Sequence, residues 1–179
     1  MKIWILDSDV DNYENVITNG TPDLDFLSSF DGRRKEAEWD ILSVARMYGN
    51  RDMSNTPGFS PHILIVDEKA YDALKDVLKN DAEFLPVELE GKRLYILNVI
   101  KVLDCIDYDK SEYKTFRDGK RIMRFKKYAF IESAIVGNEI FKIKDEPLKR
   151  PFVTTKFKDI VENSNLTGFK FELVWNSDE

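Results

Sequence analysis

Residues 62–79 read HILIVDEKAYDALKDVLK, and this stretch decides the fold class because a strand signal in it is followed by a helix signal. The run His62–Val66 is apolar and rich in β-branched residues, which favours a strand. Asp67 supplies a carboxylate that can accept a hydrogen bond from a free amide in the first turn of a helix. Apolar residues then recur at the spacing of one helix face, at Ala70, Leu74, Val77 and Leu78. The pattern predicts a strand and then an amphipathic helix over about residues 68–79.

A hairpin is predicted directly after this helix. Two strand-like runs, Phe84–Leu89 and Arg93–Val99, flank the tripeptide Glu90-Gly91-Lys92, whose glycine permits a tight turn. The chain then continues as an extended segment to Ile106. Residues 62–106 therefore predict paired strands with one helix inserted between them.

Turn residues divide the remainder of the chain into further elements. Lys2–Leu6 and Phe169–Trp175 are apolar runs that predict strands at the two ends of the sequence. The Asp-Gly pair at Asp118 and Gly119 predicts another hairpin, because this dipeptide is typical of two-residue turns. The remaining expectations are hairpin arms over about 112–116 and 121–131, a turn over 19–22 and helical turns within 23–30.

A second helix is predicted at about residues 155–162, where Phe157, Ile160 and Val161 fall on one side. Strands outnumber helices, and helices do not alternate with every strand, which is typical of α+β proteins. We predict an α+β fold with a mostly antiparallel or mixed β-sheet and two principal helices, about 68–79 and 155–162, packed on it.

Length and hydropathy predict one globular unit. A chain of 179 residues with 42% hydrophobic residues can line one core, so we expect a single domain over 1–179, with a small N-terminal lobe over 1–55 as the alternative. No apolar run approaches the ~20 residues that span a bilayer. The apolar N-terminal stretch runs directly into acids, unlike a secretory signal, and the lone Cys105 has no disulfide partner. These features predict a cytoplasmic protein.

Histidine and cysteine each occur once, at His62 and Cys105. A Ser-His-Asp or Cys-His centre would have to use His62, and a metal site with several His or Cys ligands cannot be assembled. The eight glycines form neither a GxGxxG nor a Walker motif. We therefore predict no catalytic residues, no metal site and no cofactor.

One acidic motif has the start of a calcium-loop pattern. Asp7, Asp9 and Asp11 occupy alternate positions, from which oxygen ligands can converge on a hard cation. The sixth position, however, is Asn12 instead of glycine, and the twelfth is Thr18 instead of glutamate. The motif therefore predicts an acidic loop, and in functional terms a contact surface for a cationic partner.

An enzyme is the first alternative function. Asp104 and Asp107 could act as an acid–base pair together with His62, provided that the three groups converge in one concave pocket. The structural reading is that these acids end a buried strand or accept backbone hydrogen bonds, and that Cys105 between them is a small buried apolar residue.

Nucleic-acid binding is the second alternative. The segment Lys110–Lys127 is basic and interleaved with Tyr113, Phe116 and Phe125, a combination that can follow a single strand of nucleic acid. The net charge of the whole chain is −6, which repels a phosphate backbone at long range. Lysines on an edge strand also protect a hairpin against sheet-to-sheet aggregation. The charge balance therefore disfavours nucleic acid as the main partner of this chain.

Four stretches together resemble a known bacterial family. They are residues 2–14 (KIWILDSDVDNYE), 57–62 (PGFSPH), 98–108 (NVIKVLDCIDY) and 168–175 (GFKFELVW). The sequence is similar to immunity protein family eleven, formerly a domain of unknown function, along nearly its whole length. The resemblance implies a cytoplasmic, non-enzymatic, mixed α/β protein, encoded beside a polymorphic toxin, that protects the producing cell by binding the toxin domain. It implies no catalytic residues.

The predicted function is thus a non-catalytic immunity protein that neutralises a cognate toxin. Complementary charge raises association rates, so an acidic chain suits a basic toxin domain. The predicted contact residues are Asp9, Asp11, Tyr13 and Glu14, which combine charge with an aromatic anchor on one loop. The structural alternative is that Tyr13 packs into the core and that the acids cap backbone groups.

Overall fold

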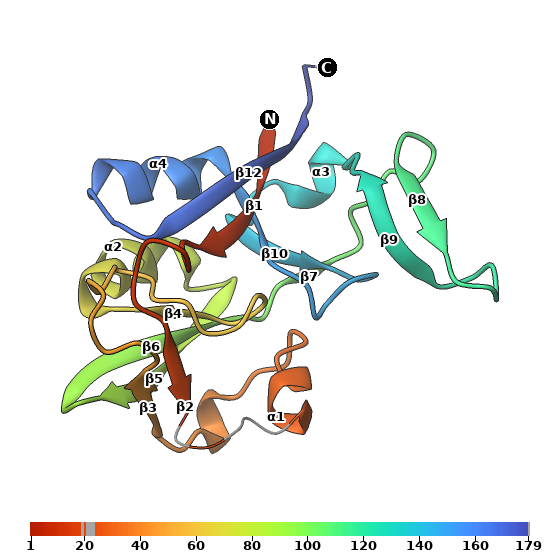
Figure 1. The fold of residues 1–179 in the computed structure, drawn as a ribbon. Coiled ribbons are helices and arrows are strands. Elements are labelled where there is room, and N and C mark those ends of the chain that lie inside the picture. The colour runs from red at the N-terminus through yellow and green to blue at the C-terminus, as the bar shows by residue number, and fades with distance from the viewer. Residues whose placement is uncertain (19, 21–23, 179) are drawn as a thin grey trace.

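The computed structural model describes residues 1–18, 20 and 24–178, and it shows an α+β fold with mixed sheets, as predicted (Figure 1). In the described residues, the first sheet has five strands in the order β12-β1-β11-β10-β7. Their bounds are Phe169–Asn176, Lys2–Ser8, Phe152–Thr154, Ile140–Ile143 and Val102–Leu103. Neighbouring strands are antiparallel except β10 and β7, which are parallel.

The second sheet likewise has five strands among the residues described, in the order β2-β3-β5-β6-β4. Their bounds are Val16–Thr18, Leu42–Arg46, Ala82–Leu89, Lys92–Val99 and Leu64–Val66. Among these described strands, only the β3–β5 pair is parallel. Strands β5 and β6 form the predicted hairpin, and its turn residues Glu90 and Gly91 both have positive φ, at 52° and 77°.

The two principal helices are α2 (Glu68–Leu78) and α4 (Thr155–Asn163), close to their predicted bounds. Asp67 caps α2 as expected, since its carboxylate accepts a hydrogen bond of 2.9 Å from the Ala70 amide. The shorter helices are α1 (Leu24–Ser28), η1 (Glu36–Glu38) and α3 (Glu132–Ile135). The turn predicted over 19–22 and the start of the helical turns at residue 23 lie mostly outside the described residues. No helix of the described chain is long and apolar enough to cross a membrane.

One buried cluster joins the two sheets. It contains Leu6 of β1, Leu97 of β6, Leu74 of α2 and Phe157 of α4, each at most 1% exposed. Burying a side chain of this size contributes about 1.5–3 kcal/mol to stability. Residues 1–55 supply strands to both sheets, because β1 belongs to the first and β2 and β3 to the second. The single domain over 1–179 stays a prediction.

A two-stranded hairpin of β8 (Glu112–Thr115) and β9 (Ile122–Lys127) extends from the body of the molecule (Figure 1). The second strand is shorter than the predicted arm over 121–131. Phe130, which is 5% exposed, pairs instead with Ile106 in an isolated bridge and packs into a core cluster. The chain is therefore drawn back into the body before residue 131.

Candidate functional site

The predicted contact residues lie on the segment Asp9–Glu14, here called the acidic loop, which leads from β1 in the first sheet to β2 in the second. A hydrogen bond of 2.7 Å from the Asp9 amide to the Gly168 carbonyl ties the start of the loop to the residue before β12. A bond of 3.3 Å from the Tyr13 amide to the Asp9 carbonyl closes the loop on itself. The acidic loop is thus held at the junction of the two sheets.

The two aspartates of the acidic loop share one lysine. Lys170 on β12 places its Nζ 2.9 Å from the Asp9 carboxylate and 3.2 Å from that of Asp11. A hydrogen bond from the Asn12 side chain, together with Lys170, lowers the pKa of Asp9. The Asp9 side chain is only 16% exposed, whereas that of Asp11 is 78% exposed. Asp11 is therefore the acid of this pair that a partner can reach.

Glu14 has a different environment from the aspartates, because its side chain is fully buried. Its carboxylate accepts hydrogen bonds from four backbone amides, those of Asn15, Tyr48, Gly49 and Arg51, at 3.1, 2.8, 2.7 and 3.4 Å. Burial favours the neutral acid, but the four amides outweigh it and lower the pKa of Glu14. Glu14 thus holds the segment after β3 against the acidic loop, and its carboxylate does not face solvent.

Arg51 also binds the acidic loop, a contact that was not predicted from the sequence. Its guanidinium donates to the backbone carbonyls of Val10, Asp11 and Tyr13, at 3.1–3.5 Å, and lies 3.9 Å from the ring centre of Tyr48. The acidic loop therefore wraps around a cation that comes from a distant part of the chain. No local sequence pattern connects residue 51 to residues 10–13.

Large apolar side chains are exposed on the acidic loop and beside it. Val10, Ile17 and Met47 are 42%, 45% and 52% exposed, and they border a hollow of about 350 Å³ that Phe59 and Pro61 also line. Tyr48 is 46% exposed on the neighbouring segment. Exposed apolar side chains next to charged ones are typical of protein interfaces. We call this region, together with Asp11 and the half-buried Tyr13, the loop surface.

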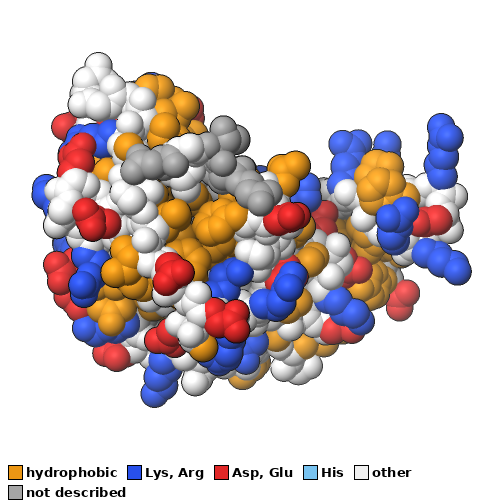
Figure 2. Space-filling model, turned by 90° about the horizontal axis from the view of Figure 1, so that it is seen from below, with side chains coloured by type: hydrophobic (Ala, Val, Ile, Leu, Met, Phe, Trp, Pro, Cys, Tyr) orange, Lys and Arg blue, Asp and Glu red, His pale blue; other side chains and the backbone are white. Residues whose placement is uncertain are grey.

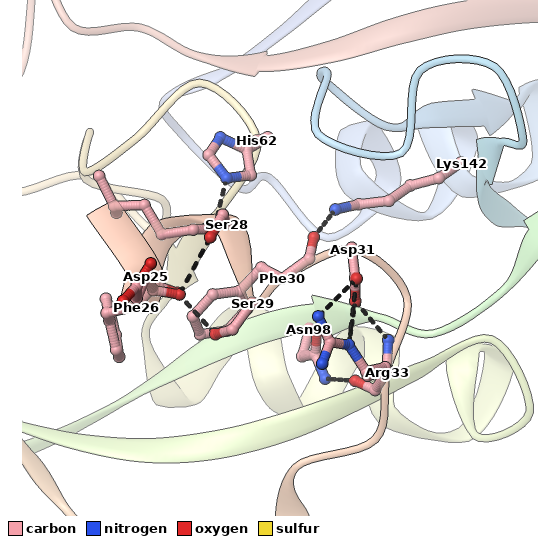
Figure 3. A network of polar contacts seen from close by, with 11 residues as sticks. Asp25, Phe26, Ser28, Ser29, Phe30, Asp31, Arg33, His62, Asn98 and Lys142 are labelled. Atoms are coloured by element: carbon pink, nitrogen blue, oxygen red, sulfur yellow. Dashed lines mark hydrogen bonds and ion pairs between the residues drawn. The ribbon is translucent and has the colours of Figure 1, made fainter. Parts of the chain in front are cut away.

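The three residues of the enzyme alternative each interact with different partners. His62 directs Nε2 to the Leu27 carbonyl at 2.9 Å (Figure 3). Its Nδ1 lies 3.3 Å from the Ser60 hydroxyl, and burial lowers the pKa of His62 against the effect of the Leu27 carbonyl. Asp104 pairs with Lys144 at 2.9 Å, and Asp107 pairs with Lys110 at 3.2 Å. In the described part of the chain, no hydrogen bond or ion pair connects any two of these three groups.

The lone thiol and the metal-binding residue types also have structural environments. Cys105 is fully buried, and burial raises the pKa of its thiol to about 12, so it is not a thiolate near neutral pH. Across residues 1–18, 20 and 24–178, no group of three or more His, Cys, Asp or Glu side chains is arranged to hold a metal ion.

Comparison with models of protein families assigns the chain to a family. The model of the immunity protein family Imm11 matches residues 42–176, about three quarters of the sequence. The chain belongs to the Imm11 immunity protein family. This confirms the resemblance to immunity protein family eleven. A search of curated proteins gave no significant match.

The Imm11 match includes the segment over residues 48–51 that Glu14 holds in place, but not the acidic loop itself. Tyr48, Gly49 and Arg51 lie within residues 42–176, whereas Asp9–Glu14 precede them. The loop surface therefore combines Val10, Asp11, Tyr13 and Ile17, which precede the matched region, with Met47, Tyr48, Phe59 and Pro61, which lie within it.

Proposed function

We propose that this Imm11 protein binds and neutralises a toxin domain in the cytoplasm of the producing bacterium, without catalysing a reaction. The match to the immunity protein family over residues 42–176 carries this proposal. The separate environments of His62, Asp104 and Asp107 support it, because catalysis by these residues would require them to act together.

The loop surface is the proposed contact region. Asp11 offers an exposed carboxylate, Tyr13 an aromatic ring, and Val10, Ile17 and Met47 an apolar rim around the hollow. Such a surface fits a toxin that presents a cation beside an apolar side chain. In this proposal Glu14 and Asp9 act by shaping the acidic loop. The Glu14 carboxylate is buried, and the Asp9 carboxylate is mostly covered by Asn12 and Lys170.

Titration of toxin activity tests the proposal. The toxin domain encoded beside this gene is purified, and increasing amounts of the protein are added to it. Stoichiometric neutralisation predicts a break at one protein per toxin and a stable complex in size-exclusion chromatography. Neutralisation by far less than one equivalent would indicate an enzyme that modifies the toxin. Absence of both a complex and growth rescue on co-expression would refute the proposal.

The loop surface is tested in the same assay with the double variant Asp11→Asn/Tyr13→Ala. Loss of an exposed charge and an aromatic anchor at an interface is expected to weaken binding at least tenfold. Asp159→Asn, an exposed aspartate on α4, serves as the control for the lost charge. Unchanged affinity and unchanged salt dependence in the double variant would remove this surface from the proposal.

A further inference from the structure

The projecting hairpin concentrates positive charge in an acidic protein. Residues 110–127, here called the arm, contain eight basic and two acidic residues, a net charge of +6. The whole chain carries −6, so the remainder carries −12. Figure 2 shows Lys and Arg side chains around the part of the surface that extends from the body. The protein therefore has two regions of opposite charge.

A series of aromatic contacts joins the arm to the body. Tyr113 of β8 lies 5.8 Å from Phe125 of β9, Phe125 lies 4.9 Å from Tyr128, and Tyr128 lies 5.1 Å from Phe152 in the first sheet, measured between ring centres. Aromatic pairs at these separations stabilise contacts by about 0.5–1.5 kcal/mol beyond their burial. The arm thus presents its charges from a defined position.

Two cations on the arm oppose each other directly. Lys114 on β8 is the cross-strand partner of Arg124 on β9, and both are exposed. Like charges at directly opposed positions destabilise an antiparallel pair. Among the described residues, the arm forms ion pairs only through Lys110 and Arg121, so neither Lys114 nor Arg124 gains a carboxylate in return. The pair is unfavourable in the free protein and would be relieved by an external anion.

A cleft at the base of the arm extends this cationic surface. It has a volume of about 620 Å³, and the cations Arg124, Lys149 and Arg150 line it together with the acids Asp7 and Glu146, so that cations are in the majority. Arg150 is paired with Asp7 at 2.9 Å, whereas Lys149 forms no ion pair with a described residue. Asp7 and Pro61 line both this cleft and the hollow of the loop surface. The arm cleft and the loop surface therefore adjoin.

We infer that the arm and its cleft bind an acidic protein segment of the toxin, with carboxylates placed against Lys114, Arg124 and Lys149. This inference rests on the proposed function for the identity of the partner. The contiguous loop surface supports it, because one partner can then cover both regions.

The observations favour a protein anion over nucleic acid. Binding of single strands needs aromatic faces on which bases can stack. The rings of Tyr113, Phe125 and Tyr128 contact one another and the body, and the Arg121 guanidinium lies 5.1 Å from the ring centre of Phe116, although Tyr113 and Phe116 stay 39% and 42% exposed. The charge of −12 on the remainder of the chain also repels an extended phosphate backbone.

The test compares two double variants of the full chain that lose the same charge. Lys114→Gln/Arg124→Gln alters the arm, and Lys79→Gln/Arg93→Gln removes two exposed, unpaired cations among the described residues, at the end of α2 and on β6. The arm variant is expected to bind the toxin at least tenfold more weakly at 0.15 M salt, with a smaller salt dependence, while the control is unchanged. Its melting temperature should equal or exceed that of wild type, because a like-charge pair is removed.

The outcomes separate this inference from the proposed function. If the wild-type complex forms but the two variants bind equally well, the arm inference is wrong and the proposed function stands. If no complex forms, a decaglutamate peptide still tests the arm: weaker binding by the arm variant than by the control supports the inference. Equal binding of the peptide by both variants overturns it. Tighter, arm-dependent binding of a ten-nucleotide oligothymidylate than of the peptide would assign the arm to nucleic acid.

Discussion

Replacing Glu14 by glutamine should destabilise the protein by about 2–4 kcal/mol. One carboxylate oxygen accepts from the Asn15 and Tyr48 amides and the other from those of Gly49 and Arg51. Glutamine keeps one acceptor oxygen and directs an NH₂ group at the remaining two amides. Each buried amide that loses its acceptor costs about 1–3 kcal/mol, and the long bond to Arg51 sets the second loss near the lower end.

Urea unfolding followed by tryptophan fluorescence at pH 7 measures this loss. In thermal unfolding of a protein of this size, the same loss corresponds to a decrease in melting temperature of about 5–15 °C. Glu36→Gln removes the same charge from an exposed position on η1 and should change stability by less than about 0.5 kcal/mol. A Glu14 variant as stable as the Glu36 variant would refute the structural role of this carboxylate.

The pH dependence of the same variant tests whether the charge of Glu14 matters. Its pKa in the folded protein lies below the ordinary value of 4.5, so its stabilising contribution is complete above that value. The contribution is lost as pH falls through the folded-state pKa, where the protonated acid becomes similar to glutamine. The stability difference between wild type and Glu14→Gln should therefore decrease on acidification from pH 6 to pH 3. A difference that does not change over this range would contradict the argument.

Three further substitutions test other parts of the fold. Gly168→Ala should lower the free energy of unfolding, measured with urea, by more than about 2 kcal/mol. The backbone φ of Gly168 is +85°, and a Cβ at this position would lie 2.2 Å from the Ser54 hydroxyl. A loss below about 0.5 kcal/mol would contradict this close approach. Lys142 is 1% exposed, and burial lowers its pKa to about 8. Between pH 8 and pH 10.5 the unfolded chain therefore binds more protons at Lys142 than the folded protein does, and the free energy of unfolding rises with pH. Relative to Lys142→Met, wild type should gain on the order of 3 kcal/mol over this range. A pH-independent difference between these two proteins would show that the ammonium is not buried. Asp67→Ala should cost at least about 1 kcal/mol, measured as a shift in the urea midpoint, because it removes the α2 cap and the acceptor of a 2.7 Å hydrogen bond from the Asn55 side chain. An unchanged midpoint would count against the cap.

Local patterns predicted the elements between residues 62 and 100 because the interactions that define them are local. The Asp67 cap reaches three residues along the chain, and the β5–β6 hairpin closes through Glu90 and Gly91. Strand order is different, since β1 lies between β12 and β11, whose residues are more than 140 positions away. The sequence signal for each strand specifies its burial pattern but not its neighbour.

The role of Glu14 shows why the site was only partly predictable. An acid in a polar loop is usually exposed, so the loop position alone favours a contact residue. The partners that bury Glu14 are backbone amides of residues 48, 49 and 51, and backbone amides are present at every non-proline position. The sequence therefore located the acidic loop but could not distinguish the exposed Asp11 from the enclosed Glu14.

Because positive charge is concentrated in the arm, the net charge of the whole chain does not by itself indicate the charge of the partner. A net charge of −6 taken alone favours a uniformly basic toxin, but such a toxin would be repelled by the arm of charge +6. A partner that covers both the loop surface and the adjoining arm cleft must carry a cation against Asp11 and carboxylates against Lys114 and Arg124. Opposed charges of this kind orient two proteins before they touch, which raises the association rate and selects one docking direction. Added salt should therefore slow association of the toxin far more than it speeds dissociation, and this salt effect should be smaller in the arm variant.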